Sequence, residues 1–476
     1  MDEKRIDAIH RARARQADAA RPEAVQAVHA NGRLTARERI ELLLDAGSAV
    51  EYGSIAALAP DSGEWVAETG GLDYIGAVDG QTLIASSTDY TDHGGGYGAG
   101  KLTHLFGLAH EHRWPVVMFV DGGGSRARHP RAGMGHIEIG GAIGPFSLFD
   151  GIAELSGWVP TIAVVSGPSY AGHASLAAFC DFLIGTRGSS IGMGGPPMVE
   201  AALGIRVTPN ELAPVEMHDV RGGIDLLVDD EPAAIDAVKR YLAFYRDADA
   251  GEPSSTHTEI ANLVPDEGPY DVLPVIEALA DEGSVFQLRP NFARSLVTAL
   301  ARLDGRSVGI AANQPLVHDG ALTEDAAAKL ARFVEICDAY EYPLISLIDT
   351  PGFVTRWEEE GDSASIERSM VRAHARPLMS QHHRTAPIFS VQIRRGGGLG
   401  TFAMGGFANG HSVSVMRLAW PGVELQHRDG FSAFENGHTF DDVIDPRETR
   451  ARISGVLRHL PRRLSREEKK HPIDTA

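Results

Sequence analysis

The feature that most constrains the fold is a long internal repeat. One apolar run ends at Asp121 in the first half of the chain, and a similar run ends at Asp349 in the second half. A turn of small residues follows each aspartate at the same interval, because Gly172 lies as far beyond Asp121 as Gly400 lies beyond Asp349. Two unrelated α/β domains are the alternative, since strand–turn–helix units are common in that class. We favour a duplication, which predicts an α/β protein of two related domains.

Length and composition agree with two domains. At 476 residues the chain exceeds the size at which a single core stops growing, and 43% of it is hydrophobic. The polar stretch 247–259 has no helical or strand periodicity, so we predict that it links a domain at 1–250 to a second domain at 260–476. We predict helix for the first 45 residues.

Charge and cysteine content exclude several classes of protein. The net charge of −20 argues against binding to nucleic acid or to an anionic membrane. The two cysteines, Cys180 and Cys337, lie in apolar segments, which excludes a disulfide framework. The first 20 residues lack the apolar core of a signal peptide, and no apolar run reaches the roughly 18 residues of a membrane-spanning helix. We therefore expect a cytoplasmic protein.

The turn at 398–403 reads GLGTFA and fits the dinucleotide-binding pattern G-x-G-x-x-[GA] after a strand. Its counterpart in the first half, 170–173, reads YAGH and lacks that pattern, which argues against a nucleotide site. Both turns precede a helical segment, where free backbone N–H groups favour negative charge. Such groups can form an oxyanion hole. Two of these turns suggest a reaction with two developing oxyanions.

Several motifs occur in one consistent order. They are LTARERI at 34–40 with LLLD at 42–45, GGPP at 194–197, NQP at 313–315 and DTPGF at 349–353. With these motifs the chain resembles the carboxyltransferase (β) subunit of biotin-dependent acyl-CoA carboxylases, of the propionyl-, acetyl- and methylcrotonyl-CoA kind, as a divergent member.

The resemblance implies two crotonase-like domains, each a β-β-α superhelix. The N-terminal domain would bind the acyl-CoA and the C-terminal domain would bind biotin carried on a separate protein. Each active site would lie between domains of two subunits, in a homo-oligomer of dimers assembled into a hexamer. A biotin carboxylase and a biotinyl carrier would be the partners, and the subunit would need no metal.

The resemblance also assigns roles to residues. The backbone pair Ala171 and Gly172 would hold the thioester enolate, and the pair Leu399 and Gly400 would hold the ureido oxygen of biotin. The remaining predicted substrate-binding residues are Lys101, Arg126, Gly194, Gly195, Pro196, Gly398 and Phe402. Independently of the resemblance, we predict that Lys101 and Arg126 contact CoA phosphates. The 194–196 segment is either a wall of the acyl pocket, because the prolines fix its backbone, or a plain turn.

The implied reaction transfers a carboxyl group from carboxybiotin to the α (or vinylogous) carbon of an acyl-CoA. The chain departs from the family where Leu399 is bulkier than expected, where one extra residue precedes Arg126, and where Phe402 replaces the aspartate of propionyl-type enzymes. Two alternatives therefore stay open: a decarboxylase of a malonyl-type thioester, and a non-catalytic scaffold subunit.

Three further groups of polar residues have two interpretations each. Asp121 and Asp349 are either catalytic acids or turn formers at strand ends. The pair 394–395 (Arg-Arg) either meets an anion or is surface charge. His173 and the pair 382–383 (His-His) lack a third ligand at metal-binding spacing, so a supporting or solvated role is the alternative to a metal.

Overall fold

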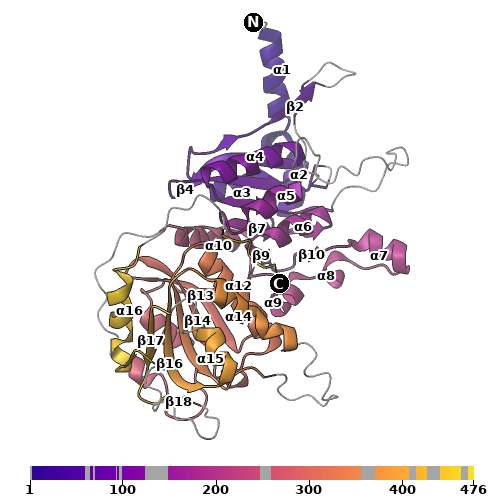
Figure 1. Cartoon of the computed structure of the whole chain (residues 1–476). Coiled ribbons are helices and arrows are strands. Elements are labelled where there is room, and N and C mark those ends of the chain that lie inside the picture. Colours follow the sequence, from indigo (N-terminus) through magenta and orange to yellow (C-terminus); the bar gives the residue numbers. More distant parts are fainter. Residues whose placement is uncertain are drawn as a thin grey trace. The chain divides into compact units, whose positions relative to one another are not determined.

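The computed structural model describes residues 3–58, 65–67, 70–92, 94–95, 99–123, 148–246, 259–354, 370–406, 414–425, 440–461 and 470–475. The chain divides into two compact units, Met1–Leu242 and Ala243–Ala476 (Figure 1). Residues 247–258 of the predicted linker lie outside the described residues, so the boundaries 1–250 and 260–476 stay predictions.

The first unit is built on a sheet with the strand order β1-β4-β5-β6-β7-β9-β11. β1 and β4 are antiparallel to their neighbours, whereas β5, β6, β7, β9 and β11 run parallel. The strands are β1 Val50–Glu51, β4 Gly71–Val78, β5 Gln81–Thr88, β6 Val116–Phe119, β7 Thr161–Val165, β9 Phe182–Thr186 and β11 Leu226–Val228. Two small ribbons complete it, β2 Ile55–Leu58 with β3 Trp65–Ala67 and β8 Pro168–Tyr170 with β10 Ser190–Gly192.

The helices of the first unit are α1 Glu3–Ala14, α2 Pro22–His29, α3 Ala36–Leu43, α4 Ala99–His112, α5 Leu148–Leu155, α6 Gly172–Phe179, α7 Pro196–Leu203, α8 Pro209–Leu212, α9 Val215–Arg221 and α10 Glu231–Phe244. The core forms where α4 and α5 pack on the parallel strands, with Phe106 and Ile152 buried against Val116 and Met118. Parallel strands need helices on their faces, which explains the continuous apolar runs in the sequence.

The second unit repeats this plan with the strand order β12-β13-β14-β15-β16-β17-β19. Its strands are β12 Phe286–Leu288, β13 Leu296–Leu303, β14 Arg306–Asn313, β15 Leu344–Thr350, β16 Ile388–Gly396, β17 Met416–Ala419, β18 Glu424–Leu425, which pairs with β16, and β19 Asp442–Val443. Its helices are α11 Leu273–Leu279, α12 Glu324–Ala339, α14 Ala375–His383, α15 Gly398–Gly405 and α16 Thr449–Leu457. A separate apolar core includes Val308, Leu347, Phe389 and Val391.

The duplication extends to single hydrogen bonds. The turns Asp79–Gly80 and Asp304–Gly305 each connect the antiparallel hairpin of their unit, and all four residues have positive φ. In the first turn the two amides donate to the carboxylate of Asp45 at 3.0 and 2.8 Å, and in the second they donate to Asp281 at the same distances. An aspartate just after the end of a preceding helix therefore fixes the hairpin turn in both units.

The predicted single helical segment at 1–45 is interrupted. Pro22 lacks an amide hydrogen and begins α2 at its first position, where that loss is tolerated. Gly32 follows α2 with φ 68°, and Thr35 then starts α3 with a capping box completed by Glu38. The pattern T-A-R-E in the sequence was the signal for this second start.

Two further findings concern predictions from composition. Cys180 and Cys337 are buried free thiols. Within the described ranges, no helix combines the length and apolar character needed to cross a bilayer.

Candidate active site

In the first unit, the loop between β8 and α6 carries the predicted pair Ala171 and Gly172. Ala171 has φ 52° and ψ −122°, a strained conformation for a residue with a side chain. Its amide donates to the carbonyl oxygens of Gly192 (3.3 Å) and Met193 (3.2 Å). The amide of Gly172, the first residue of α6, meets no hydrogen-bond acceptor among the described residues. Of this pair, Gly172 therefore offers the open N–H.

His173, the second residue of α6, contacts two segments next to this loop. Its Nε2 lies 2.6 Å from the carbonyl oxygen of Gly95, so Nε2 carries the hydrogen and donates. Burial lowers the pKa of His173, which favours the neutral ring. The ring also lies close under Gly122, where a Cβ atom would approach its ring atoms within 2.4 Å. Of the two interpretations from sequence, the geometry favours a supporting role.

In the second unit, the equivalent loop joins β16 to α15. The amide of Gly397 donates to Thr350 at 3.0 Å, whereas those of Gly398, Leu399 and Gly400 meet no acceptor in the described part of the chain. Gly398 has φ 48°, a conformation that glycine adopts without cost. A Cβ atom on Gly400 would lie 2.7 Å from the Cα atom of Gly352, so α15 packs backbone to backbone on the turn after β15.

Leu399 and Phe402 lie three residues apart on α15, which places them on one face of the helix. They are 50% and 44% exposed. The Leu399 side chain therefore does not fill the core under the loop. Because only its amide is needed for an oxyanion hole, the bulk of this side chain is compatible with that role.

The predicted wall of the acyl pocket forms the start of α7. Gly195 is the N-cap residue and Pro196 is the first helical residue. Gly194 precedes them, and a Cβ atom on Gly195 would approach the ring of Tyr170 at 3.4 Å. This segment therefore lies beside the strand that leads into the α6 loop.

Lys101, a predicted CoA ligand, is engaged within the first unit. Its Nζ lies 3.1 Å from a carboxylate oxygen of the buried Asp73. Lys329, at the equivalent position of the second repeat, donates to the carbonyl oxygens of Arg289, Phe292 and Leu296 at 2.7–2.8 Å. In both units this lysine therefore ties a helix to the sheet region, and contact of Lys101 with CoA stays a prediction. Arg126, the second predicted phosphate ligand, lies outside the described residues.

Asp121 and Asp349 are buried structural anchors. Asp121 accepts from Arg39 at 2.7 Å and also pairs with Arg33, while the amides of Ser166 and Gly167 donate to its other oxygen. Burial opposes its ionisation, but the charges of Arg39 and Arg33 outweigh this effect and lower the pKa of Asp121 to about 2. These contacts favour the turn-forming interpretation.

Asp349 also pairs with two arginines, which in the second unit are consecutive residues of β16. Arg394 and Arg395 each donate through Nε to Asp349 at 2.9 Å. Arg394 is almost fully buried, and its guanidinium lies 4.7 Å above the ring of Tyr270. Neither interpretation of this arginine pair from sequence, an anion ligand or surface charge, describes these contacts. The two arginines instead hold the end of β15 beside β16.

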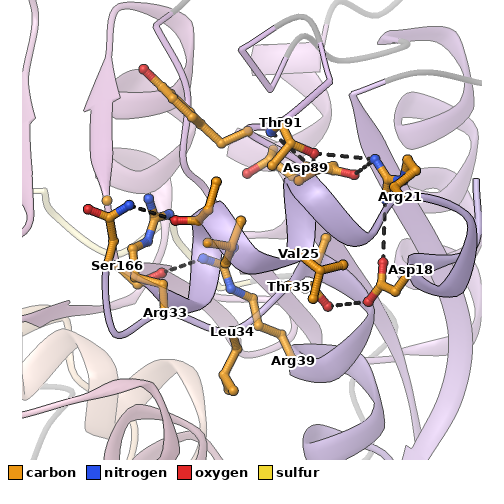
Figure 2. A pocket seen from close by; sticks show the side chains of 18 of the residues that line it. Asp18, Arg21, Val25, Arg33, Leu34, Thr35, Arg39, Asp89, Thr91 and Ser166 are labelled. Carbon is orange, nitrogen blue, oxygen red and sulfur yellow. Dashed lines mark hydrogen bonds and ion pairs between the residues drawn. The ribbon is translucent and has the colours of Figure 1, made fainter.

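A cavity of about 410 Å³ in the first unit is bounded by α2, by the segment 33–39 and by the ends of β5 and β7 (Figure 2). The arginines of its wall are paired with carboxylates. Arg21 lies 2.7 Å from Asp89 and 3.4 Å from Asp18, and Arg39 is held by Asp121 and Glu231. The buried Arg39, which the sequence reasoning missed as an anchor, is the second arginine of the ARER motif.

The histidines 382 and 383 end α14, and their rings contact each other edge to face. In the part of the chain that the structure describes, no group of three or more His, Cys, Asp or Glu residues could hold a metal ion.

Residues 27–425 match the family model described as the carboxyl transferase domain. The chain belongs to the carboxyl transferase family. It is 30% identical to the methylmalonyl-CoA carboxyltransferase 12S subunit of Propionibacterium freudenreichii subsp. shermanii over 502 residues, which cover 94% of this chain and 92% of that protein.

Solved structures agree with this assignment to the carboxyl transferase family. A single-chain, multi-domain long-chain acyl-CoA carboxylase matches with a TM-score of 0.81 at 31% identity over 94% of this chain. The present chain spans only 50% of that longer protein. The transcarboxylase 12S hexamer, solved with methylmalonyl-CoA and methylmalonic acid bound, gives a TM-score of 0.78 at 29% identity, with 94% of this chain and 95% of that chain covered.

Two predictions from the sequence are thereby confirmed. The resemblance to carboxyltransferase subunits is correct, and the fold consists of two crotonase-like α/β domains from an internal duplication. The chain is an acyl-CoA carboxylase-type carboxyltransferase at the level of the family. The roles of individual residues stay predictions.

Proposed function

We propose that this chain transfers a carboxyl group from carboxybiotin, carried on a separate protein, to the α (or vinylogous) carbon of an acyl-CoA. One observation carries the proposal: two helices one repeat apart, α6 and α15, begin with open amides at equivalent positions of two related sheets. Family membership supplies the reaction class, and the repeat supplies two places where an oxyanion can be stabilised.

On the acyl-CoA side, the amide of Gly172 would donate to the thioester oxygen. Loss of the α-proton moves negative charge onto that oxygen, and the N-terminal end of α6 favours this charge. The amide of Ala171 already bonds Gly192 and Met193, so it can join only by exchanging that bond. Its constrained backbone would instead direct the Gly172 amide toward the substrate.

On the biotin side, the residues present fit a ureido carbonyl. Open space surrounds Gly398, since a Cβ atom there would meet no described atom within 4 Å. The amides of Leu399 and Gly400 are available to an oxygen that approaches through this space. When bound, carboxybiotin supplies the carboxyl group. The chain would hold the ureido oxygen and keep the donor oriented toward the acyl-CoA.

The partners would be a biotin carboxylase and a biotinyl carrier protein. We further propose a homo-oligomer of dimers assembled into a hexamer, in which each site combines domains of two subunits. What supports this is the likeness to the 12S protein, whose solved structure is a hexamer. Phe402 in place of a substrate-selecting aspartate favours an acyl group longer than propionyl.

The test is exchange of labelled carbon dioxide into a panel of acyl-CoA thioesters, with and without a biotinyl carrier or free biotin. Biotin-dependent exchange supports the proposal and names the substrate. Carbon dioxide loss from a malonyl-type thioester without biotin would replace it with the decarboxylase. No turnover with an intact assembly would favour the scaffold. Gly172→Pro is the matched variant, because proline at the first helical position removes the amide at little cost to the helix.

A further inference from the structure

Large exposed apolar side chains gather at one place in the first unit, the segment 193–205 that contains α7. Met193, Met198 and Leu203 are 71%, 64% and 69% exposed, and Ile205 is also exposed. No residue of α7 is buried. Figure 1 shows α7 standing clear of the sheet of its own unit. An apolar cluster of this kind normally marks a binding surface.

The apolar residues of α7 share one face. At 100° per residue, Met198, Ala202, Val199 and Leu203 fall within a sector of about 140°. Glu200 lies outside this sector, and its carboxylate pairs with Arg206 at 2.6 Å. The face therefore presents no charge of its own helix to a ligand. We call Met193 together with this face of α7 the apolar strip.

The strip is continuous with the loop that carries Gly172. The carbonyl oxygen of Met193 accepts the amide of Ala171 at 3.2 Å, and the Met193 sulfur lies 3.9 Å from the hydroxyl of Ser175 on α6. The strip thus starts next to the first turn of α6 and continues away from it along α7. A ligand held at Gly172 would therefore have this apolar surface beside it, in addition to the ring of Phe149.

We propose that the apolar strip binds the acyl chain of the substrate, and that the substrate is a CoA thioester of a medium- to long-chain acyl group. This inference rests on the proposed function, which places the thioester at Gly172. α7 is about 12 Å long, which matches an extended chain of roughly ten carbons. Methionine side chains are unbranched and polarizable, so they adapt to a flexible alkyl chain.

The test measures binding rather than turnover, with unreactive thioether analogues of acetyl-, butyryl-, octanoyl- and dodecanoyl-CoA and the full-length chain. Burial of one methylene increases affinity by up to about fourfold. We expect affinity to increase along the series for the wild type. Met198→Ser should weaken the dodecanoyl analogue about tenfold and the acetyl analogue less than twofold. Val50→Ser, at an exposed apolar position on β1, is the control and should match the wild type.

The outcomes separate this inference from the proposed function. Equal affinity for all chain lengths would overturn the acyl-chain site while leaving the proposed function intact. Failure to bind even free CoA would overturn both. Light scattering on the same samples tests whether the strip instead contacts a second copy of the chain. If Met198→Ser changes the oligomeric mass and weakens the binding of all analogues equally, the strip is such a contact and the inference is wrong.

Discussion

Replacing Gly400 with alanine tests whether backbone packing holds the α15 amides in place. The new Cβ atom would lie 2.7 Å from the Cα atom and 3.1 Å from the carbonyl carbon of Gly352. Gly352 has little room to move away, because a Cβ atom placed on it would lie 2.9 Å from the carbonyl oxygen of Gly397. α15 must therefore move, and overpacking of this kind costs about 1–3 kcal/mol of unfolding free energy.

The repeat supplies a matched control at the equivalent position of the first unit. At Gly172 the nearest described atom to a new Cβ is Cζ of Phe149 at 3.9 Å, an ordinary contact distance. Gly172→Ala removes no amide and begins a helix, so we expect a change in stability within about 0.5 kcal/mol. The same substitution should therefore be harmful in one unit and neutral in the other.

The two variants should also differ in activity. A displacement of about 1 Å at a catalytic group can cost 10²-fold in rate. We expect Gly400→Ala to reduce carboxyl exchange about 10²-fold and Gly172→Ala to reduce it less than threefold. Calorimetry reports the thermal unfolding of each variant, and labelled carbon dioxide exchange reports the rate. If both variants match the wild type in stability and rate, contact with Gly352 does not position the amides.

Three other substitutions test the buried polar contacts. Asp121→Asn should destabilise the chain by about 3–5 kcal/mol in chemical unfolding, because it leaves the buried Arg39 with one carboxylate partner, Glu231, instead of two. Since the folded pKa of Asp121 is about 2, below its ordinary 3.8, the wild-type advantage should disappear as pH falls from about 5 to 2. Lys329→Met should lower the melting temperature, because three buried carbonyls lose their donor at a cost of about 1–3 kcal/mol. His471 lies 3.0 Å from Asp338, beside Lys470 and Glu335; burial opposes its charge, but the hydrogen bond to Asp338 raises its pKa. Protection of the C-terminal segment from hydrogen exchange should therefore be full below pH 6.5 and decrease as pH rises through the raised pKa. His471→Gln should remove this pH dependence.

Regular structure and the repeat were predictable from the sequence because both depend on local patterns. The apolar runs that lead to Asp121 and Asp349 form the parallel strands β6 and β15. The equal interval between aspartate and glycine in the two halves was the strongest signal, since it reflects the same strand–helix–strand unit in two copies.

The ionic contacts were not predictable, because their partners lie far apart in the chain. Arg39 meets Asp121 and Glu231, which follow it by 82 and 192 residues. No periodicity or local motif reports such pairs. Lys101, predicted to contact a CoA phosphate, is a further example, because its ammonium group lies 3.1 Å from a carboxylate oxygen of Asp73. The sequence shows which residues carry charge, and only the fold shows which charges are already satisfied.

The two copies have diverged in how they expose their amides, and this divergence would suit the two ligands of the proposed function. In the first unit the strain lies at Ala171, whose amide is held by Gly192 and Met193, so a single open donor begins α6. In the second unit the residue with positive φ is Gly398, one residue earlier than the position equivalent to Ala171. The amides of the residues that follow it meet no acceptor in the described part of the chain. A thioester enolate needs a donor beside an apolar surface for its chain. A ureido oxygen carried on a flexible arm needs an accessible turn with several donors. Under the proposed function, one duplicated scaffold would serve both ligands with the positive-φ residue at two different positions of the loop.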